Sequence, residues 1–255
     1  MTGAMNADRR RLALAALAGF LFAVAAFAPA GLVAAAITRA SPLAAIAGAE
    51  GSVWRGRLKG YSHNGVLIGD VSYRLHALPL LIGRLSFDVT SENGALLGAA
   101  RVRLSPGSAE LRDVSATFNL GAIRRYTFFG VRYQGSASLK AGRIRMARAA
   151  CASEEAAIST TAFDALARRW SGGAFPMTGS IDCREGALVA TLKGEGADGA
   201  ATVTVTLRPD FMYGLTVAAR PRRPEVRRAL EAFGFEKRND GLSYEATGAL
   251  KGLTS

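Results

Sequence analysis

Residues 61–68 (YSHNGVLI) carry the strongest fold signal in this chain. Asn64-Gly65 is a preferred dipeptide for a two-residue β-hairpin turn, because both residues accept a positive φ. Residues 71–75 (VSYRL) then alternate apolar and polar side chains. A period of two gives one buried and one wet face, as in antiparallel sheets. The stretch therefore predicts a β-hairpin with one face packed on a core.

The same pattern continues on the C-terminal side. Residues 85–89 (LSFDV) and 101–105 (RVRLS) alternate in the same way, and Asn93-Gly94 and Pro106-Gly107 supply turns between them. Short strands repeating in this way predict a mainly β domain. We expect a curved antiparallel β-sheet or roll, or a sandwich. Residues 203–207 and 242–246 add further alternating strands.

Two segments favour short helices. In residues 159–170 (STTAFDALARRW), Ser159, Thr160 or Thr161 can cap the start, and Phe163, Leu166 and Trp170 form an apolar stripe. Gly172-Gly173 ends that segment. The second helix is expected over residues 224–233, with Pro224 in the first turn, Val226, Leu230 and Phe233 on one face, and Gly234 as terminator.

The N-terminal end predicts a membrane anchor. Arg9, Arg10 and Arg11 precede residues 12–37, which carry no charge, and about 20 apolar residues suffice to span a bilayer as a helix. The positive-inside bias keeps the arginines in the cytoplasm. We therefore expect a cytoplasmic tail over 1–11, a transmembrane signal-anchor over 12–37, a linker over 38–49 and a periplasmic β-rich domain over 50–255, with two similar halves at about 50–150 and 151–255. A cleaved signal peptide ending near residues 28–30 (APA) is the alternative.

The charge does not point to nucleic acid. The chain has a formal net charge of +12, but only five of its 32 basic residues are lysines, and the arginines are scattered through strand-like segments. Outward positions of strands are naturally polar. An exported domain also has no access to nucleic acid, so no nucleic-acid partner is expected.

The two cysteines, Cys151 and Cys183, favour a disulfide, because an even count in an oxidising compartment is typical of paired thiols. Two unrelated buried thiols are the alternative. His63 and His76 are the only histidines and lie far from both cysteines in sequence. No spacing of ligands typical of a metal site occurs, so no metal is expected.

No catalytic set is recognisable in the sequence. The chain has no nucleophile elbow, phosphate-binding loop or dinucleotide fingerprint. Glu154 and Glu155 are adjacent, so they point in different directions; we expect them near a helix N-terminus rather than in an acid–base pair. We therefore expect no enzymatic activity and no cofactor, and a protein that works by binding, with exposed strand edges as candidate contacts.

Several motifs resemble one family, the type II secretion system protein N family. Residues 50–56 (EGSVWRG) look like its G-x-[VL]-W-x-G signature, and residues 73–85 are similar to its W-x-L…P-x-x-L-x-G-x-L run, with Tyr73 in place of Trp. Residues 176–183 and 230–250 resemble its later glycine motifs, the first with the second cysteine. The positions matched, all expected to be structural, are Gly51, Trp54, Gly56, Tyr73, Pro79, Gly83, Gly179, Gly234, Phe235 and Gly248.

The resemblance implies a non-enzymatic, single-pass inner-membrane component of the type II secretion machinery, with partners among the other secretion subunits. Two alternatives are kept. The first is a periplasmic lipid-handling module that holds a lipid in an apolar groove of a curved sheet. The second is an unrecognised periplasmic enzyme, which would need a concave pocket with convergent polar groups.

Overall fold

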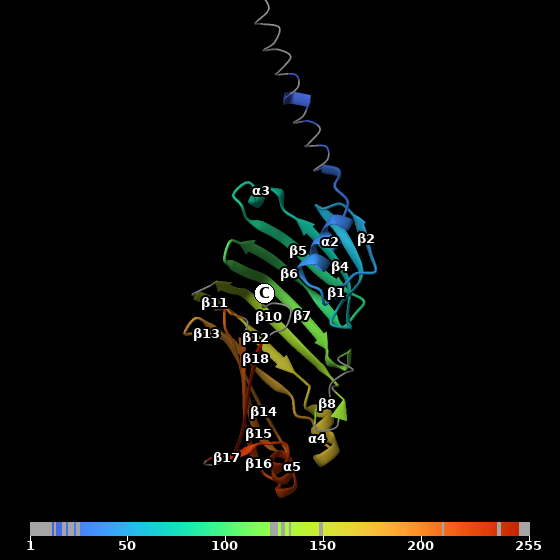
Figure 1. The fold of residues 1–255 in the computed structure, drawn as a ribbon. Helices are drawn as coiled ribbons and strands as arrows, with labels where there is room; N and C mark the ends of the chain where they lie inside the picture. Colours follow the sequence, from blue (N-terminus) through green and yellow to red (C-terminus); the bar gives the residue numbers. More distant parts are fainter. Residues whose placement is uncertain are drawn as a thin grey trace, which may run out of the picture.

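The computed structural model consists mainly of one large open sheet (Figure 1). It describes residues 12, 14–16, 19, 23, 26–122, 127–128, 131–132, 134–147, 150–210, 212–238 and 241–249. Sixteen strands belong to this sheet, and every pair in it is antiparallel. The mainly β, antiparallel fold predicted from the sequence is thus confirmed, in its curved-sheet form.

The strands follow one another as a meander. The first part of the sheet contains β1 (Ala44–Ala45), β2 (Gly48–Gly51), β3 (Arg55–His63), β4 (Val66–Leu75), β5 (Leu85–Glu92), β6 (Leu96–Ser105) and β7 (Ser108–Asn119). The second part contains β10 (Ser136–Ala147), β11 (Ala150–Glu154), β12 (Ala157–Thr160), β13 (Met177–Arg184), β14 (Ala187–Gly196), β15 (Gly199–Leu207), β16 (Met212–Pro221), β17 (Glu236–Arg238) and β18 (Gly241–Ala249). A separate two-stranded sheet pairs β8 (Thr127–Phe128) with β9 (Val131–Arg132).

The predicted turns are present. Asn64 and Gly65 adopt φ values of 50° and 74°, and they join β3 to β4. A positive φ at both positions is what the Asn-Gly hairpin turn requires. Asn93 (φ 60°) and Gly107 (φ 75°) turn the chain after β5 and β6. The alternating segments at 71–75, 85–89, 101–105, 203–207 and 242–246 all lie in strands.

The first predicted helix begins later than expected. Ser159 and Thr160 belong to β12, which pairs with β10 and β13, so the strand ladder takes these two candidate caps. The hydroxyl of Thr161, the third candidate, instead accepts a hydrogen bond from Ser136 N at 2.9 Å. The hydroxyl of Thr160 donates to the backbone oxygen of Ser136 at 2.9 Å. Helix α4 (Asp164–Ser171) follows without a side-chain cap, and Gly172 ends it with φ 77°.

The second predicted helix is α5 (Pro224–Ala232), with Val226 and Leu230 buried. Phe233, expected on the same face, is 50% exposed because it lies just beyond the helix end, and Phe235 is buried instead. Glu154 and Glu155 are not near a helix start, since Glu154 ends β11 and Glu155 (φ 50°) leads into β12.

Besides the two short helices predicted for the folded body, the structure contains others, one of which overlaps the end of the predicted anchor. Helix α2 (Gly31–Ala40) contacts β1 and β2, α3 (Ala77–Leu80) precedes β5, and η1 (Leu120–Ala122) is a 3₁₀ turn after β7. The predicted tail, 1–11, and residues 13, 17, 18, 20–22, 24 and 25 of the predicted anchor, 12–37, lie outside the described residues. Of the helices that the structure does describe, none has both the length and the apolar character to cross a membrane.

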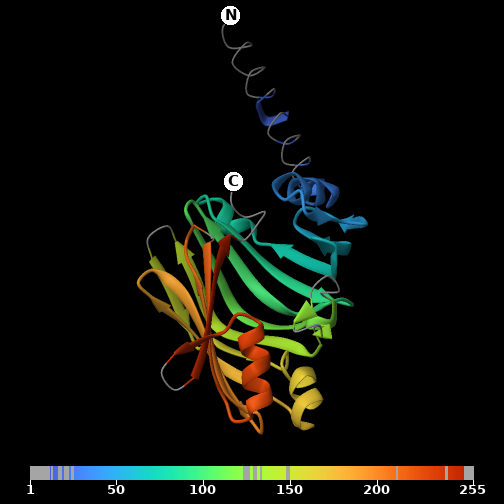
Figure 2. The ribbon, with the colours of Figure 1, turned by 60° about the horizontal axis from the view of Figure 1, so that its bottom comes forward.

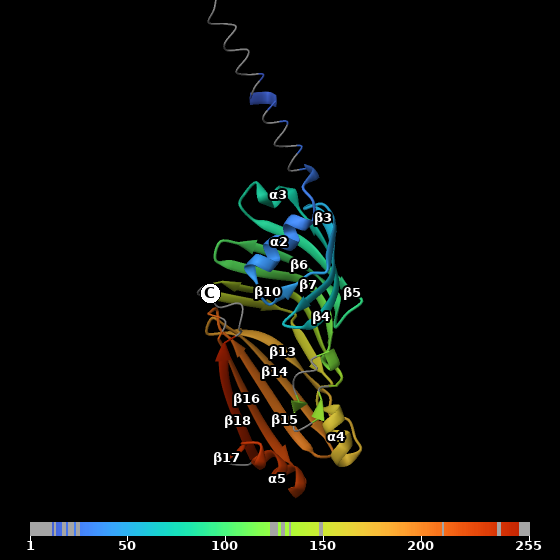
Figure 3. The ribbon, with the colours of Figure 1, turned by 45° about the vertical axis from the view of Figure 1, so that its right-hand side comes forward.

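The sheet curls around one of its faces (Figure 2). Helices α4 and α5 lie inside this curve, at the end opposite to α2 and α3 (Figures 1 and 3). One buried cluster joins α5 to β16 and β18 through Val226, Leu230, Ala219 and Leu242. A second cluster, around Val114 and Ile144, lies where β7, β10 and the segment after β11 meet.

Candidate functional site

The strand register lines up one residue from each main strand on the same face. Directly opposite residues of an antiparallel pair share a face of the sheet. We call this set the inner row; from β3 to β18 it contains Leu58, Val71, Ser91, Gly98, Ala116, Leu139, Ile158, Gly179, Leu192, Val203, Val217 and Tyr244. No member carries a charge. An uncharged line therefore crosses almost the whole sheet.

Two parallel rows widen this line into an apolar surface. The first contains Leu96, Phe118, Ala137, Thr160, Met177, Gly194, Ala201, Ala219 and Leu242. The second contains Ile181, Ala190, Val205, Leu215 and Ala246. Together with the inner row they form what we call the inner face. Because α5 packs on Ala219 and Leu242, the inner face is the concave side on which Figure 2 shows this helix.

The helices α4 and α5 cover one end of the inner face and, together with the sheet, line a partly open cavity of about 90 Å³. Its walls are mainly apolar and include Leu166 and Trp170 of α4, Leu230 of α5, and Val203 and Val217 of the sheet. Pockets for small-molecule ligands typically measure about 300–1,000 Å³. This cavity is thus a packing gap beneath the two helices rather than a ready binding site.

Asp198 is the one ionisable residue in the wall of that cavity, and only 6% of it is exposed. The hydroxyl of Ser171 donates to its Oδ2 at 2.8 Å, and Nη1 of Arg223 lies 3.6 Å from its Oδ1. The same Nη1 donates to the backbone oxygen of Trp170 at 2.8 Å. Asp198 therefore ties the end of α4 and the start of α5 to the β14–β15 turn. Asp198 was not predicted from the sequence to have a role, although Asp198-Gly199 is a turn signal.

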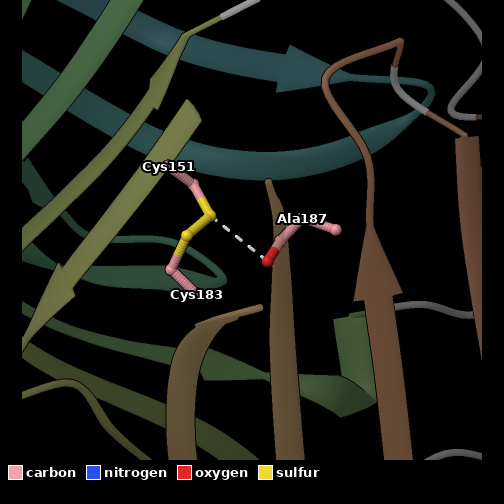
Figure 4. Close-up of a disulfide and its surroundings, with 3 residues drawn as sticks. All are labelled: Cys151, Cys183 and Ala187. Carbon is pink, nitrogen blue, oxygen red and sulfur yellow. Dashed lines mark hydrogen bonds between the residues drawn. A yellow bond between two sulfur atoms is a disulfide. The ribbon is translucent and has the colours of Figure 1, made fainter. Parts of the chain in front are cut away.

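A disulfide joins Cys151 to Cys183, with the Cα atoms 5.7 Å apart (Figure 4). Strand β10 pairs with β12 over its first part and with β11 over its second. In the described structure no β-ladder pairs β11 with β13. Near this point a single hydrogen bond runs from Ile181 N of β13 to Ala156 O, just after β11. The disulfide therefore closes a split in the sheet. Sγ of Cys151 also lies 3.2 Å from Ala187 O, which is a contact, because a disulfide sulfur carries no proton to donate.

The two edges of the sheet are closed to different extents. Strands β2 and β1 pair with residues 56–59 and 62–63 of β3, so this edge is largely covered. At the other edge, β17 pairs only with residues 241–243 of β18. Among the described residues, no strand pairs with the outer side of residues 244–249, which we call the open edge. Unpaired strand edges are ready templates for another chain.

The opposite face of the first half of the sheet carries charges. One row contains Arg55, Arg74, Asp88, Arg101, Arg112, Arg143 and Glu154. Within it, Nε of Arg101 donates to Oδ1 of Asp88 at 2.8 Å, and Nε2 of His76 lies 2.9 Å from Oδ2. The hydrogen bond from Arg101, aided by His76, lowers the pKa of Asp88 despite partial burial. His76 thus has a hydrogen-bonding partner in Asp88. No cluster of His, Cys, Asp and Glu suited to a metal occurs in the described parts of the chain.

The structure brings the first group of motif residues together. Gly51 has φ 90°, and a Cβ there would meet the backbone oxygen of Arg55 at 2.5 Å. The backbone oxygen of Trp54 accepts from Leu75 N at 2.8 Å. The ring of Tyr73 lies over Gly56, where a Cβ would meet its hydroxyl at 2.6 Å. Gly51, Trp54, Gly56 and Tyr73 therefore form one packed corner of β2, β3 and β4.

The other motif residues are dispersed. Pro79 and Gly83 lie in and after α3, and Gly83 has φ 68° with open space around it. Gly179 is in the inner row. Phe235 is buried against Tyr244 with ring centroids 5.3 Å apart, next to Gly234 (φ 86°). Gly248 faces the ring of Tyr213, which a Cβ would meet at 2.8 Å.

A family model described as type II secretion system (T2SS), protein N, matches residues 42–244, well over half of the chain. No curated protein matches the chain significantly, and neither does any solved structure.

Proposed function

Because this chain belongs to the type II secretion system protein N family, as its motifs indicated, we propose that it is a non-enzymatic accessory component of that machinery. Its family membership indicates a role in type II secretion and a place in the cell envelope. We further propose that its folded body acts in the periplasm, through contacts with other subunits of the secretion system.

Two observations support the periplasmic placement. The disulfide between Cys151 and Cys183 suits an oxidising compartment. The uncharged stretch 12–37 behind three arginines suits a single inner-membrane anchor with the N-terminus in the cytoplasm. On this proposal residues 1–11 are cytoplasmic, 38–49 link the anchor to the body, and 50–255 form the periplasmic domain, with its two similar halves.

The single observation that carries the contact proposal is the open edge of β18. A partner strand can add to an exposed edge through backbone hydrogen bonds, and the flanking side chains then select the partner. Glu245 and Thr247, two residues of this edge, are exposed. The opposite edge of the sheet is largely closed by β1 and β2. One end of the sheet is thus suited to another chain and the other is not.

Co-purification tests the proposal. The full-length protein, tagged and expressed at its native level, is solubilised from membranes, and its partners are quantified by mass spectrometry. The control is an unrelated tagged inner-membrane protein of similar abundance. We expect other secretion-system subunits to be enriched over the control. Equal recovery of those subunits in both samples would argue against a role through protein contacts.

The inner face supports a second candidate, the handling of a lipid. Three uncharged rows of mostly apolar residues line a concave surface, and α4 and α5 cover only one end of it. The test is native mass spectrometry of the gently purified protein. We expect a bound lipid that Val205→Asp removes and Thr204→Asp, on the opposite face of the same strand, retains. Wild-type protein without lipid would exclude this candidate.

A further inference from the structure

A second cavity lies on the charged side of the molecule, next to α3. Its volume is about 580 Å³, within the range of ligand sites. The walls come from α3, the turn that follows it, and strands β5, β6, β7 and β10. Its charged lining consists of Arg84, Arg103, Glu110, Arg112, Arg143 and Arg145. We call this cavity the arginine groove.

The strand register explains why these arginines converge. Arg103, Glu110 and Arg145 lie opposite one another on β6, β7 and β10. Arg112 and Arg143 form the adjacent pair two residues along the same strands. Neighbouring strands are about 4.8 Å apart, and a step of two residues covers about 7 Å. Four guanidinium groups and one carboxylate therefore share a small area, and Arg84 reaches the same cavity from the turn after α3.

Glu110 neutralises only part of this charge. Arg112 Nε donates to Glu110 Oε1, and Arg143 Nε lies 3.5 Å from the same oxygen. Burial would raise the pKa of Glu110, but the hydrogen bond from Arg112 and the charges of Arg112, Arg143 and Arg103 lower it overall. The carboxylate thus stays ionised, and Arg112 and Arg143 both contact the same oxygen of it.

The other three arginines of the groove form no close ion pair within the part of the chain that the structure describes. Among the described residues, no carboxylate lies within 4 Å of Arg84, Arg103 or Arg145. Arg103 and Arg145 are also exposed. Like charges gathered in a groove raise the local concentration of anions and repel one another until an anion binds. Arg is especially suited to phosphate, because its planar fork can donate two parallel hydrogen bonds.

An apolar ledge borders the groove. Leu78 and Ile82 line it, and these two residues with Leu81 are 79%, 67% and 82% exposed. Together they form a patch on α3 and the turn after it. Large apolar side chains exposed as a group mark interaction or membrane sites, whereas single ones are common on any surface. A cationic groove beside an apolar ledge has the two chemical features of an interface between water and an anionic membrane.

The ledge also lies at one end of the molecule. Figures 1 and 3 show α3 at the same end as α2, the helix through which the chain enters the body. Helix α4 and helix α5 are at the far end. A membrane in contact with the ledge would therefore face the end of the body where the N-terminal stretch enters. A chain anchored in the membrane through that stretch would have this orientation.

We propose that the arginine groove binds the phosphate of an anionic phospholipid, while Leu78, Leu81 and Ile82 contact the apolar boundary of the bilayer. The body would then rest against the membrane surface through the arginine groove and the ledge beside it. The site is separate from the inner face and from the open edge, and its orientation toward the bilayer rests on the membrane anchor proposed above.

Titration with short-chain lipids tests the proposal. Full-length protein in a nonionic detergent is titrated with dihexanoyl phosphatidylglycerol, dihexanoyl phosphatidylcholine or inorganic phosphate, and binding is followed by microscale thermophoresis. We expect phosphatidylglycerol to bind at least about tenfold more tightly than the other two, and the affinity to fall with added salt because charge attraction is screened. Equal affinity for the two lipids would overturn the proposal. Inorganic phosphate binding as tightly as phosphatidylglycerol would identify a free-anion site instead.

Variants locate the site. Arg103→Gln combined with Arg145→Gln should weaken phosphatidylglycerol binding at least about tenfold. Arg227→Gln combined with Arg228→Gln, the same charge change on the exposed side of α5, should leave it unchanged. Ile82→Asp should weaken binding of the lipid more than binding of inorganic phosphate. Unchanged affinity in a groove variant whose thermal unfolding matches wild type would refute the assignment. If that variant misfolds, the lipid preference and the salt dependence of the wild-type protein still decide whether the proposal holds.

Discussion

The hydroxyl of Tyr73 donates a hydrogen bond of 2.8 Å to the backbone oxygen of Ser52. Ser52 lies between β2 and β3, and Tyr73 lies on β4, so this bond closes the corner where the sheet begins. Gly56 leaves room for the tyrosine ring. Partial burial raises the pKa of Tyr73, so the hydroxyl remains a donor at neutral pH. The residue matched to the family's usual Trp therefore supplies both ring packing and a polar contact.

Removing this hydroxyl should weaken the fold measurably. Tyr73→Phe keeps the ring but leaves the Ser52 carbonyl without this donor, and such a loss costs about 0.5–1.5 kcal/mol. Urea unfolding followed by circular dichroism measures the change. Tyr213→Phe is the matched control, since no hydrogen bond from the Tyr213 hydroxyl occurs within the described residues. Equal effects of the two changes would contradict the assigned role of the Tyr73 bond.

Gly179 should tolerate no side chain. A Cβ at this position of the inner row would lie 1.7 Å from the backbone oxygen of Thr191 on the neighbouring strand. Either the β13–β14 ladder must open or the strand must shift. Gly179→Ala should therefore lower the free energy of unfolding by more than about 3 kcal/mol or prevent folding. Gly214→Ala, where the nearest atom is 4.0 Å away, should cost less than about 1 kcal/mol. Thermal unfolding of both variants gives the comparison.

Loss of the disulfide should destabilise the junction between β11 and β13. The two cysteines are separated by 32 residues, and closing a loop of this size is worth roughly 3–4 kcal/mol by chain entropy. We expect the Cys151→Ser, Cys183→Ser double variant to lose about 2–4 kcal/mol in urea unfolding. Mass spectrometry of alkylated, unreduced protein from cells should find the linked peptide. Free thiols at both positions would contradict the bond and the proposed exported location.

Acid should destabilise the fold partly by protonating the carboxylate of Asp88. Because Arg101 lowers its pKa in the folded state, this carboxylate stabilises the fold above its unfolded pKa of about 4. That contribution is lost as the pH falls through the lower folded pKa. The stability difference between wild type and Asp88→Asn should therefore be present at pH 6 and shrink below about pH 4. Urea midpoints measured between pH 6 and pH 2.5 check this, and a constant difference would refute it.

Local signals in the sequence predicted much of the fold. Asn64-Gly65 located the first hairpin, because a two-residue turn depends on the φ preferences of those residues alone. The start of α4 was misplaced, because pairing of Thr160 with β10 and β13 overrides its capping preference. Helix α3 is only four residues long and has no apolar period to detect.

The sites were less predictable than the fold. Val71 and Val203 were expected to be buried on one face of their strands, but their common row depends on the register of every strand between them. The same holds for Arg103 and Arg145, which meet only through β7. The Cys151–Cys183 bond was predictable from composition, whereas the split in the sheet that it closes was not.

Photo-crosslinking at the open edge tests the central claim most directly. A benzoylphenylalanine is placed at Thr247, beside the open edge of β18, or at Arg57 on the covered β3, in cells that produce the protein at its native level. We predict that illumination links Thr247, but not Arg57, to another subunit of the secretion system. Equal adducts at both positions, or none at Thr247 in correctly folded protein, would contradict a body that works by adding a partner to this edge.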